Sequence, residues 1–109
     1  NFLNEERFAK SFVRGKLRIK HWGRNKILQE LKFKGISDYC IKKGMEEIEK
    51  EEYERILDLL LEKKNRLLKE TDLFRKRKKV ADYAIRRGFE SSLVWKAVKR
   101  LIPDNEAVE

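Results

Sequence analysis

Two stretches of the chain share one pattern, and this pattern decides the fold. Residues 27–41 read ILQELKFKGISDYCI, and residues 80–94, which lie 53 positions further on, read VADYAIRRGFESSLV. In each stretch, apolar residues at helical spacing end at a glycine, a hydrophobic residue follows, and a second helical pattern begins. A glycine just past the last turn of a helix readily adopts the left-handed backbone that ends it. Each stretch is therefore predicted to form a helix, a tight turn and a second helix.

A longer helix is predicted before each of these stretches. The apolar pattern of residues 8–13 recurs 48 positions later in residues 56–61, within a Leu-rich pattern that extends from about Glu51 to Lys69. The order is therefore long helix, short helix, glycine, short helix, and it occurs twice. We expect an all-α, elongated fold that is built from two tandem three-helix repeats.

Short polar residues mark the expected starts of several helices. Asn4, Ser37 and either Thr71 or Asp72 are expected to be N-caps, because their side chains can accept hydrogen bonds from free backbone N–H groups. Pro103 follows the last helical pattern and cannot continue it. The predicted division of the chain is one three-helix repeat at 1–49, a second at 50–102 and a frayed tail at 103–109.

The composition excludes several classes of protein. The 109 residues include one Cys and one His, which leaves no internal disulfide, no Cys-rich or His-based metal site and no catalytic triad. No Gly-rich phosphate loop occurs, and no apolar run of ~18 residues could span a membrane. We therefore expect a non-enzymatic protein of the cytoplasm with no cofactor and no metal. The chain begins without Met, so we also expect it to be part of a longer protein.

The charge is strongly basic and unevenly distributed. The net charge is +9, from 28 Lys and Arg against 19 Asp and Glu. Two basic blocks, residues 1–34 and 63–87, flank an acidic block at residues 45–58. A basic balance of this size favours polyanions or acidic protein surfaces as partners. The acidic block is expected to be a solvated face, with contact to the basic face of a neighbouring unit or a partner as the alternative.

Helical spacing arranges the basic residues into two stripes. Each stripe is long enough to follow a phosphate backbone or an acidic groove. Solvated helix faces are the alternative, but each stripe contains few acidic residues that could form ion pairs one turn away, which favours binding. The ring of Tyr83 could stack on a base, and the ring of Trp22 is left open between packing and exposure. The candidate binding residues are Arg7, Lys10, Arg14, Arg18 and His21 on the first stripe, the adjacent Arg24, and Lys76, Lys79, Tyr83, Arg86 and Arg87 on the second.

Four segments carry a resemblance to a known family. They are residues 2–9 (FLNEERFA), 23–27 (GRNKI), 30–36 (ELKFKGI) and 81–89 (ADYAIRRGF). Together they resemble the RecX family of recombinase regulators, with Ala84 where a Leu is common. The resemblance implies three tandem three-helix repeats in the family, of which this chain would supply the second and third.

The same resemblance implies a function. Members of the family are similar in binding the RecA recombinase and its nucleoprotein filament on DNA, and in lowering its ATPase and strand-exchange activity. For this chain the resemblance implies RecA and its nucleoprotein filament as partner. Apart from the resemblance, we expect weak and sequence-independent DNA contact, because nothing resembles a base-reading helix, and we expect no membrane span and a monomeric state. The two stripes and Arg24 would then be the residues that contact RecA or DNA.

Two other interpretations compete with this one. Residues 25–34, 35–37 and 38–48 have the spacing of a helix-turn-helix DNA-binding protein. The helix that would read bases begins with Ser-Asp-Tyr-Cys and carries Glu-Glu near its end, which suits a DNA groove poorly. The second alternative is a helical scaffold that binds only protein.

Overall fold

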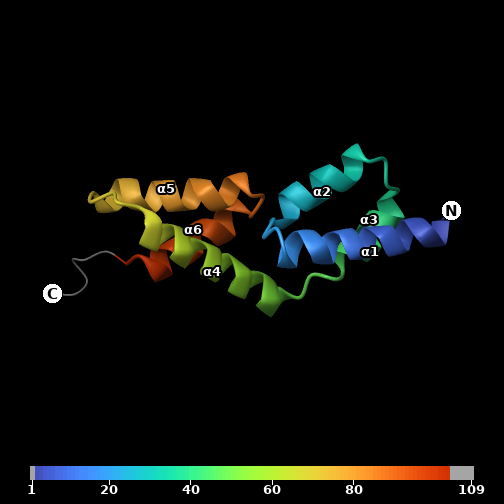
Figure 1. Cartoon of the computed structure of the whole chain (residues 1–109), viewed down its shortest axis with the longest axis horizontal. Helices are drawn as coiled ribbons and strands as arrows, with labels where there is room; N and C mark the ends of the chain where they lie inside the picture. The colour runs from blue at the N-terminus through green and yellow to red at the C-terminus, as the bar shows by residue number, and fades with distance from the viewer. Residues whose placement is uncertain (1, 104–109) are drawn as a thin grey trace.

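The protein is all-helical throughout residues 2–103, which are the residues that the computed structural model describes. The helices are α1 (Phe2–Arg18), α2 (Arg24–Phe33), α3 (Asp38–Met45), α4 (Lys50–Leu67), α5 (Leu73–Arg86) and α6 (Ser91–Leu101) (Figure 1). The predicted all-α class is confirmed. The expected frayed tail falls, apart from Pro103, outside the described residues.

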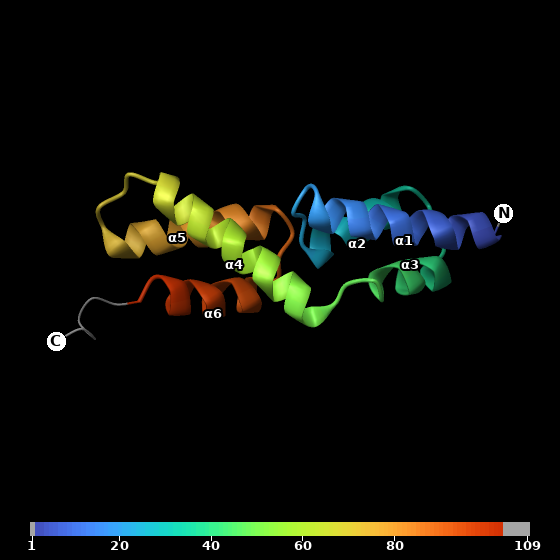
Figure 2. The ribbon, with the colours of Figure 1, turned by 60° about the horizontal axis from the view of Figure 1, so that its bottom comes forward.

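The helices form two three-helix units that lie end to end, as Figures 1 and 2 show. The molecule measures 60 × 23 × 20 Å, and its radius of gyration is 16.2 Å. A compact globular chain of similar length would have a radius of gyration of ~13 Å. The predicted elongated tandem arrangement is therefore confirmed.

The first unit is built on the contact between α1 and α3. These helices approach so closely that a Cβ atom on Gly44 would lie 3.0 Å from Ala9. The apolar faces that the helical spacing predicts point into this contact and towards α2. The buried residues of the unit are Ala9, Val13, Leu17, Ile27, Leu31, Cys40 and Ile41.

The second unit repeats this core with the sizes of the side chains exchanged. Ala9 of α1 corresponds to Leu57 of α4, whereas Leu31 of α2 corresponds to Ala84 of α5, and all four are buried. A larger side chain on one helix thus accompanies a smaller one on the next, which keeps the volume of the core similar. The buried residues of α4, α5 and α6 are Tyr53, Leu57, Leu60, Leu61, Val80, Ala81, Ala84, Val94, Ala97 and Val98.

Two of the predicted N-caps are confirmed and one is wrong. The side chain of Ser37 accepts a hydrogen bond from the backbone N–H of Cys40, and that of Asp72, rather than Thr71, accepts one from Arg75. Asn4 lies inside α1, because this helix already begins at Phe2.

The two units are joined by a contact between main chains. The loop between α1 and α2 lies against the turn between α5 and α6, where the N–H of Gly23 donates to the carbonyl of Arg87 at 2.7 Å and that of Asn25 donates to Gly88 at 2.9 Å. A Cβ atom on Gly23 would lie 2.2 Å from the backbone nitrogen of Phe89. The approach is therefore possible only because the loop carries a glycine.

Gly88 meets two requirements at once. Its φ of 100° lies in the left-handed region, and a Cβ atom there would lie 2.6 Å from the backbone nitrogen of Lys26 in the other unit. Gly35, its counterpart in the first unit, also has a left-handed backbone with φ of 76°, but a Cβ atom there would meet open space. Comparing Gly35 with Gly88 therefore distinguishes the effect of the left-handed backbone from the effect of the close contact at the junction.

We expect Gly88→Ala to destabilise the protein more than Gly35→Ala does. The left-handed backbone alone should cost about 1–2 kcal/mol at either position, and Gly88→Ala should add the loss of the junction. Urea unfolding of the two variants and the parent measures this difference. Equal losses would show that the junction adds nothing to stability.

Candidate protein and nucleic-acid interface

The first basic stripe is partly neutralised by the acidic block. The guanidinium of Arg14 lies 2.8 Å from the carboxylate of Glu47, and that of Arg18 donates two hydrogen bonds, at 2.8 and 3.2 Å, to Glu52 on α4. The hydrogen bonds with Glu52 raise the pKa of Arg18. The expectation of a purely solvated acidic face is therefore wrong for Glu47 and Glu52, and the alternative of contact with basic faces holds for them.

The rest of the first stripe is more open. Lys10 pairs with Glu6 one helical turn away, at 3.0 Å, whereas Arg7 is exposed and has no ion pair within the described residues. His21 is exposed and has a positive φ of 57°. Exposed ion pairs of this kind contribute little to stability, so an anionic ligand could displace them.

Arg24 and Arg87 are used at the junction between the units. The guanidinium of Arg24 lies 2.9 Å from the carboxylate of Glu90 and 4.0 Å from the centre of the Tyr53 ring. Arg87 donates to the backbone carbonyls of Lys20 and His21. Sequence reasoning assigned both arginines to binding, but a partner would have to share them with these structural contacts.

Tyr53 is the buried centre of this junction, and its role was not predicted. Its hydroxyl accepts from the backbone N–H of Arg24 at 2.9 Å and donates to Glu90, while its ring lies 5.1 Å from that of Phe89. Burial, followed by the hydrogen bond to Glu90, raises the pKa of Tyr53. Burial also acts to raise the pKa of Glu90, but hydrogen bonds from Tyr53 and Arg24 outweigh it, and the pKa is lowered.

The second stripe comes together around a depression of about 200 Å³ between α4 and α5. Lys64 of α4 was not predicted; its ammonium lies 4.7 Å from the centre of the Tyr83 ring. Lys79 pairs with Glu70 at 2.9 Å and thereby lowers the pKa of that carboxyl, whereas Arg86 is exposed. Lys76 is half-buried and lies outside the lining. The lining residues are Lys64, Leu68, Lys79, Asp82, Tyr83 and Arg86.

The two stripes meet end to end. The C-terminal ends of α1 and α5 point towards each other near the middle of the molecule (Figure 1). There the guanidinium of Arg87 contacts the backbone that follows α1. The ends of the two stripes therefore lie close together, but the stripes face different sides: the first pairs with Glu47 and Glu52, and the second lies between α4 and α5.

The helix-turn-helix alternative gains no support from the geometry. The helix that would enter a DNA groove, α3, buries Cys40, Ile41 and Gly44 and has Asp38 in its first turn. Within the described residues no group of three or more His, Cys, Asp or Glu side chains could hold a metal ion. Among the helices in residues 2–103, none is both long and apolar enough to cross a membrane.

The fold and its charge define a basic protein of tandem three-helix repeats. The family model described as the second three-helix domain of RecX matches residues 4–45, and that of the third three-helix domain matches residues 50–98. The chain belongs to the RecX family.

Curated relatives agree with this assignment. The chain is 31% identical over 111 residues to the regulatory protein RecX of Clostridium perfringens (strain 13 / Type A), covering 100% of this chain and 51% of that protein. It is 34% identical over 104 residues to the regulatory protein RecX of Clostridium botulinum (strain Eklund 17B / Type B), covering 94% and 48%. The chain thus spans about half the length of these relatives. No solved structure matches it.

The junction predicts a specific pH dependence. The pKa of Glu90 is lower in the folded than in the unfolded protein, so its contribution is complete above the unfolded value of ~4.3 and is lost as the pH falls from there through the folded pKa. We expect Glu90→Gln to lower the Tm by about 5 °C or more at pH 7. The Tm of this variant should also fall less steeply than that of the parent as the pH drops below about 4.3.

Calorimetry or circular dichroism across this pH range measures the effect. Glu54→Gln, a change at an exposed glutamate of α4, is the control and should follow the parent. Some decline should remain in every variant, because Glu5 and Glu70 also have lowered pKa values. A Glu90→Gln variant with the parent's pH profile would contradict the role given to this carboxylate.

Proposed function

We propose that this chain modulates the RecA recombinase by binding RecA or the RecA–DNA filament through its basic helical faces and inhibiting ATPase and strand exchange. The observation that carries the proposal is the match of two successive RecX three-helix domains, in order, over most of the chain. In this role the protein acts in the cytoplasm as a monomer, in DNA recombination, repair and the SOS response, without catalysis or a cofactor.

The shape of the molecule supports a filament as the partner. A molecule 60 Å long with a basic stripe on each of its two units can contact more than one subunit of a filament. A filament that holds DNA offers both carboxylates and phosphates, and arginine binds either through two parallel hydrogen bonds. Three of the expected binding residues, Arg7, His21 and Arg86, are exposed and have no ion pair within the described residues.

We expect Arg86→Glu to weaken inhibition of the RecA ATPase on single-stranded DNA by about 5- to 30-fold, because an attractive contact becomes repulsive. Titration of the variant and the parent into the ATPase assay measures the shift. The Tm should hardly change, since exposed charges rarely decide stability.

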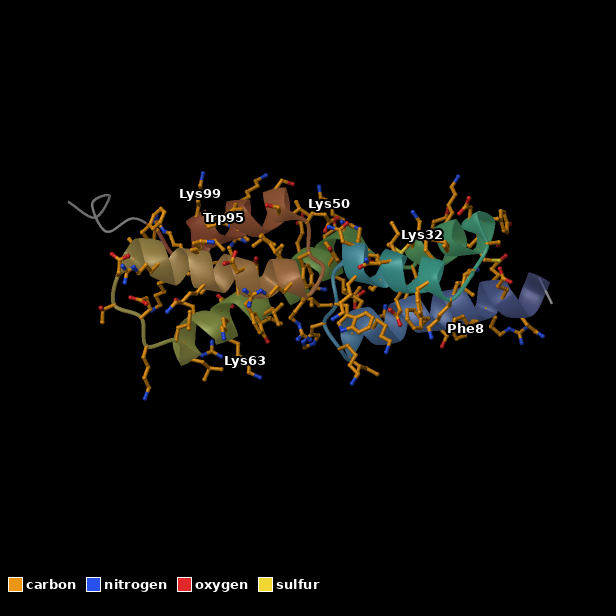
Figure 3. The ribbon with its side chains drawn as sticks, turned by 90° about the horizontal axis from the view of Figure 1, so that it is seen from above. Phe8, Lys32, Lys50, Lys63, Trp95 and Lys99 are labelled. Atoms are coloured by element: carbon orange, nitrogen blue, oxygen red, sulfur yellow. The ribbon has the colours of Figure 1, made fainter. Side chains whose placement is uncertain are left out.

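Lys99→Glu is the matched control for this test. Lys99 is exposed on α6 and lies at the opposite edge of the molecule from Phe8 of α1 and Lys63 of α4, as Figure 3 shows. The two substitutions change the net charge equally. If Arg86→Glu inhibits as strongly as Lys99→Glu, the proposed surface is wrong.

Direct contact with DNA is tested by the salt dependence of the affinity. If about five phosphates are neutralised, the logarithm of the affinity for a single strand should fall with the logarithm of salt concentration at a slope of about −3.5. Binding titrations at several salt concentrations measure this slope. A slope near zero with measurable affinity would favour the scaffold that binds only protein.

A further inference from the structure

A row of aromatic rings lies on the side of α1 that faces α2, away from the predicted stripe. The centroids of Phe8 and Phe12 are 5.7 Å apart, and that of Trp22 lies 6.5 Å from Phe12 in an edge-on arrangement. Phe8, which the sequence pattern placed on the core face, is 44% exposed, and the other two rings are half-buried. Figure 3 shows Phe8 along the α1 edge of the molecule. Phe12 and Trp22 also pack against the core, and their open sides together with Phe8 form an exposed aromatic surface.

Lysines surround this row of rings. The ammonium of Lys16 lies 4.7 Å from the centre of the Trp22 ring and 5.3 Å from that of Phe12. Lys26 lies 4.5 Å from the centre of the Trp22 ring, and Lys34 lies 5.8 Å from that of Phe12. Cation–π contacts at exposed sites are weak, so these ammonium groups can move from the ring faces to a phosphate.

A shallow depression of about 210 Å³ continues the surface beside Phe12. A Cβ atom on Gly15, at its floor, would meet nothing within 4 Å. Glycine weakens the interior of a helix, and no neighbour in the fold requires one here. A small residue at this position leaves room for a ligand. The lining residues are Ser11, Phe12, Gly15, Lys16, Ile19 and Lys20.

The second unit carries positive charge at equivalent positions. Lys64 lies 48 positions after Lys16, and Lys79 and Arg87 lie 53 positions after Lys26 and Lys34. These are the offsets that relate the helices of the two repeats. In the second unit the ring is that of Tyr83, which has Lys64 at 4.7 Å and Arg87 at 5.7 Å from its centre.

The two equivalent faces lie on one side of the molecule. In Figure 1, α1 and α2 of the first unit and α4 and α5 of the second face the viewer, with α3 and α6 behind them, and Figure 2 agrees. One extended ligand could therefore contact both faces.

We propose that the α1–α2 face and the α4–α5 face, with their aromatic rings and the basic side chains around them, bind single-stranded nucleic acid. Unpaired bases stack on Phe8, Phe12 and Trp22 in the first unit and on Tyr83 in the second, and the cations bind the phosphates. Aromatic rings within a positive groove suit single strands, since every unpaired base has a face that can stack. Unpaired bases and the phosphates between them would use the rings and the cations together. This assignment deepens the proposed function, because it names the ligand of a surface outside the predicted first stripe.

The test compares two ligands with equal numbers of phosphates. Fluorescence anisotropy of a labelled oligo-dT strand and of an abasic strand of the same length is measured with the whole chain, without RecA. Stacking predicts that the dT strand binds about fivefold or more tightly. Equal affinities, or no binding of either strand, would overturn the proposal.

Three variants locate the binding. Phe8→Ala should weaken dT binding by about fivefold or more, whereas Phe74→Ala, the same change at a ring on α5 that is 75% exposed, should leave it unchanged. Gly15→Leu should fill the depression and weaken binding while raising the Tm, since leucine favours a helix over glycine. A Phe8→Ala variant that binds dT as tightly as Phe74→Ala would overturn the site.

The outcome does not depend on RecA. If the chain prefers dT over the abasic strand and Phe8→Ala weakens dT binding, but RecA is not inhibited, this site is supported and the proposed function is wrong. If RecA is inhibited while dT and abasic strands bind equally, the proposed function stands and the stacking site is wrong.

Discussion

The main-chain contact between the two units is the constraint on which the other features depend. The hydrogen bond from Gly23 to the carbonyl of Arg87, 2.7 Å long, holds the loop of one unit against the turn of the next. The chain itself joins α3 to α4 only through residues 46–49. The contact therefore sets the end-to-end arrangement, and with it the length of the molecule. It also brings the ends of the two basic stripes together and turns equivalent faces of both repeats to one side.

The end-to-end arrangement brings like partial charges together, and arginines at the junction offset this repulsion. The C-terminal ends of α1 and α5, which carry partial negative charge, face each other across the junction (Figure 1). Arg87 donates to two backbone carbonyls beyond the end of α1, and Arg24 stabilises the carboxylate of Glu90 next to Tyr53. Basic residues are thus needed here for assembly. A high density of arginine near a junction is therefore not by itself evidence of a ligand site.

The features that were predictable from sequence are those with local causes. The helices, the turns at Gly35 and Gly88, and the caps at Ser37 and Asp72 follow from spacing and from the conformational preferences of single residues. The pair between Arg18 and Glu52, and the hydrogen bonds of the Tyr53 hydroxyl, depend on how one unit packs on the next, and no local pattern encodes that. The exposure of Phe8 shows the same limit, since a helical apolar stripe does not reveal where the core ends. Lys64 could have been found from the repeat in the sequence, because the 48-residue offset relates it to Lys16.

The repeat also separates what the fold requires from what it does not. At core positions the two units differ freely in side-chain size, as Ala9 and Leu57 or Leu31 and Ala84 do, because only the total volume has to be kept. At the face between the first and second helices, positive charge recurs at all three equivalent positions. The junction accounts for Arg87, but charged side chains at the surface rarely decide stability, so packing does not account for Lys64 and Lys79. A ligand that presents similar anionic groups to both units, as the phosphates of one extended strand do, would account for them.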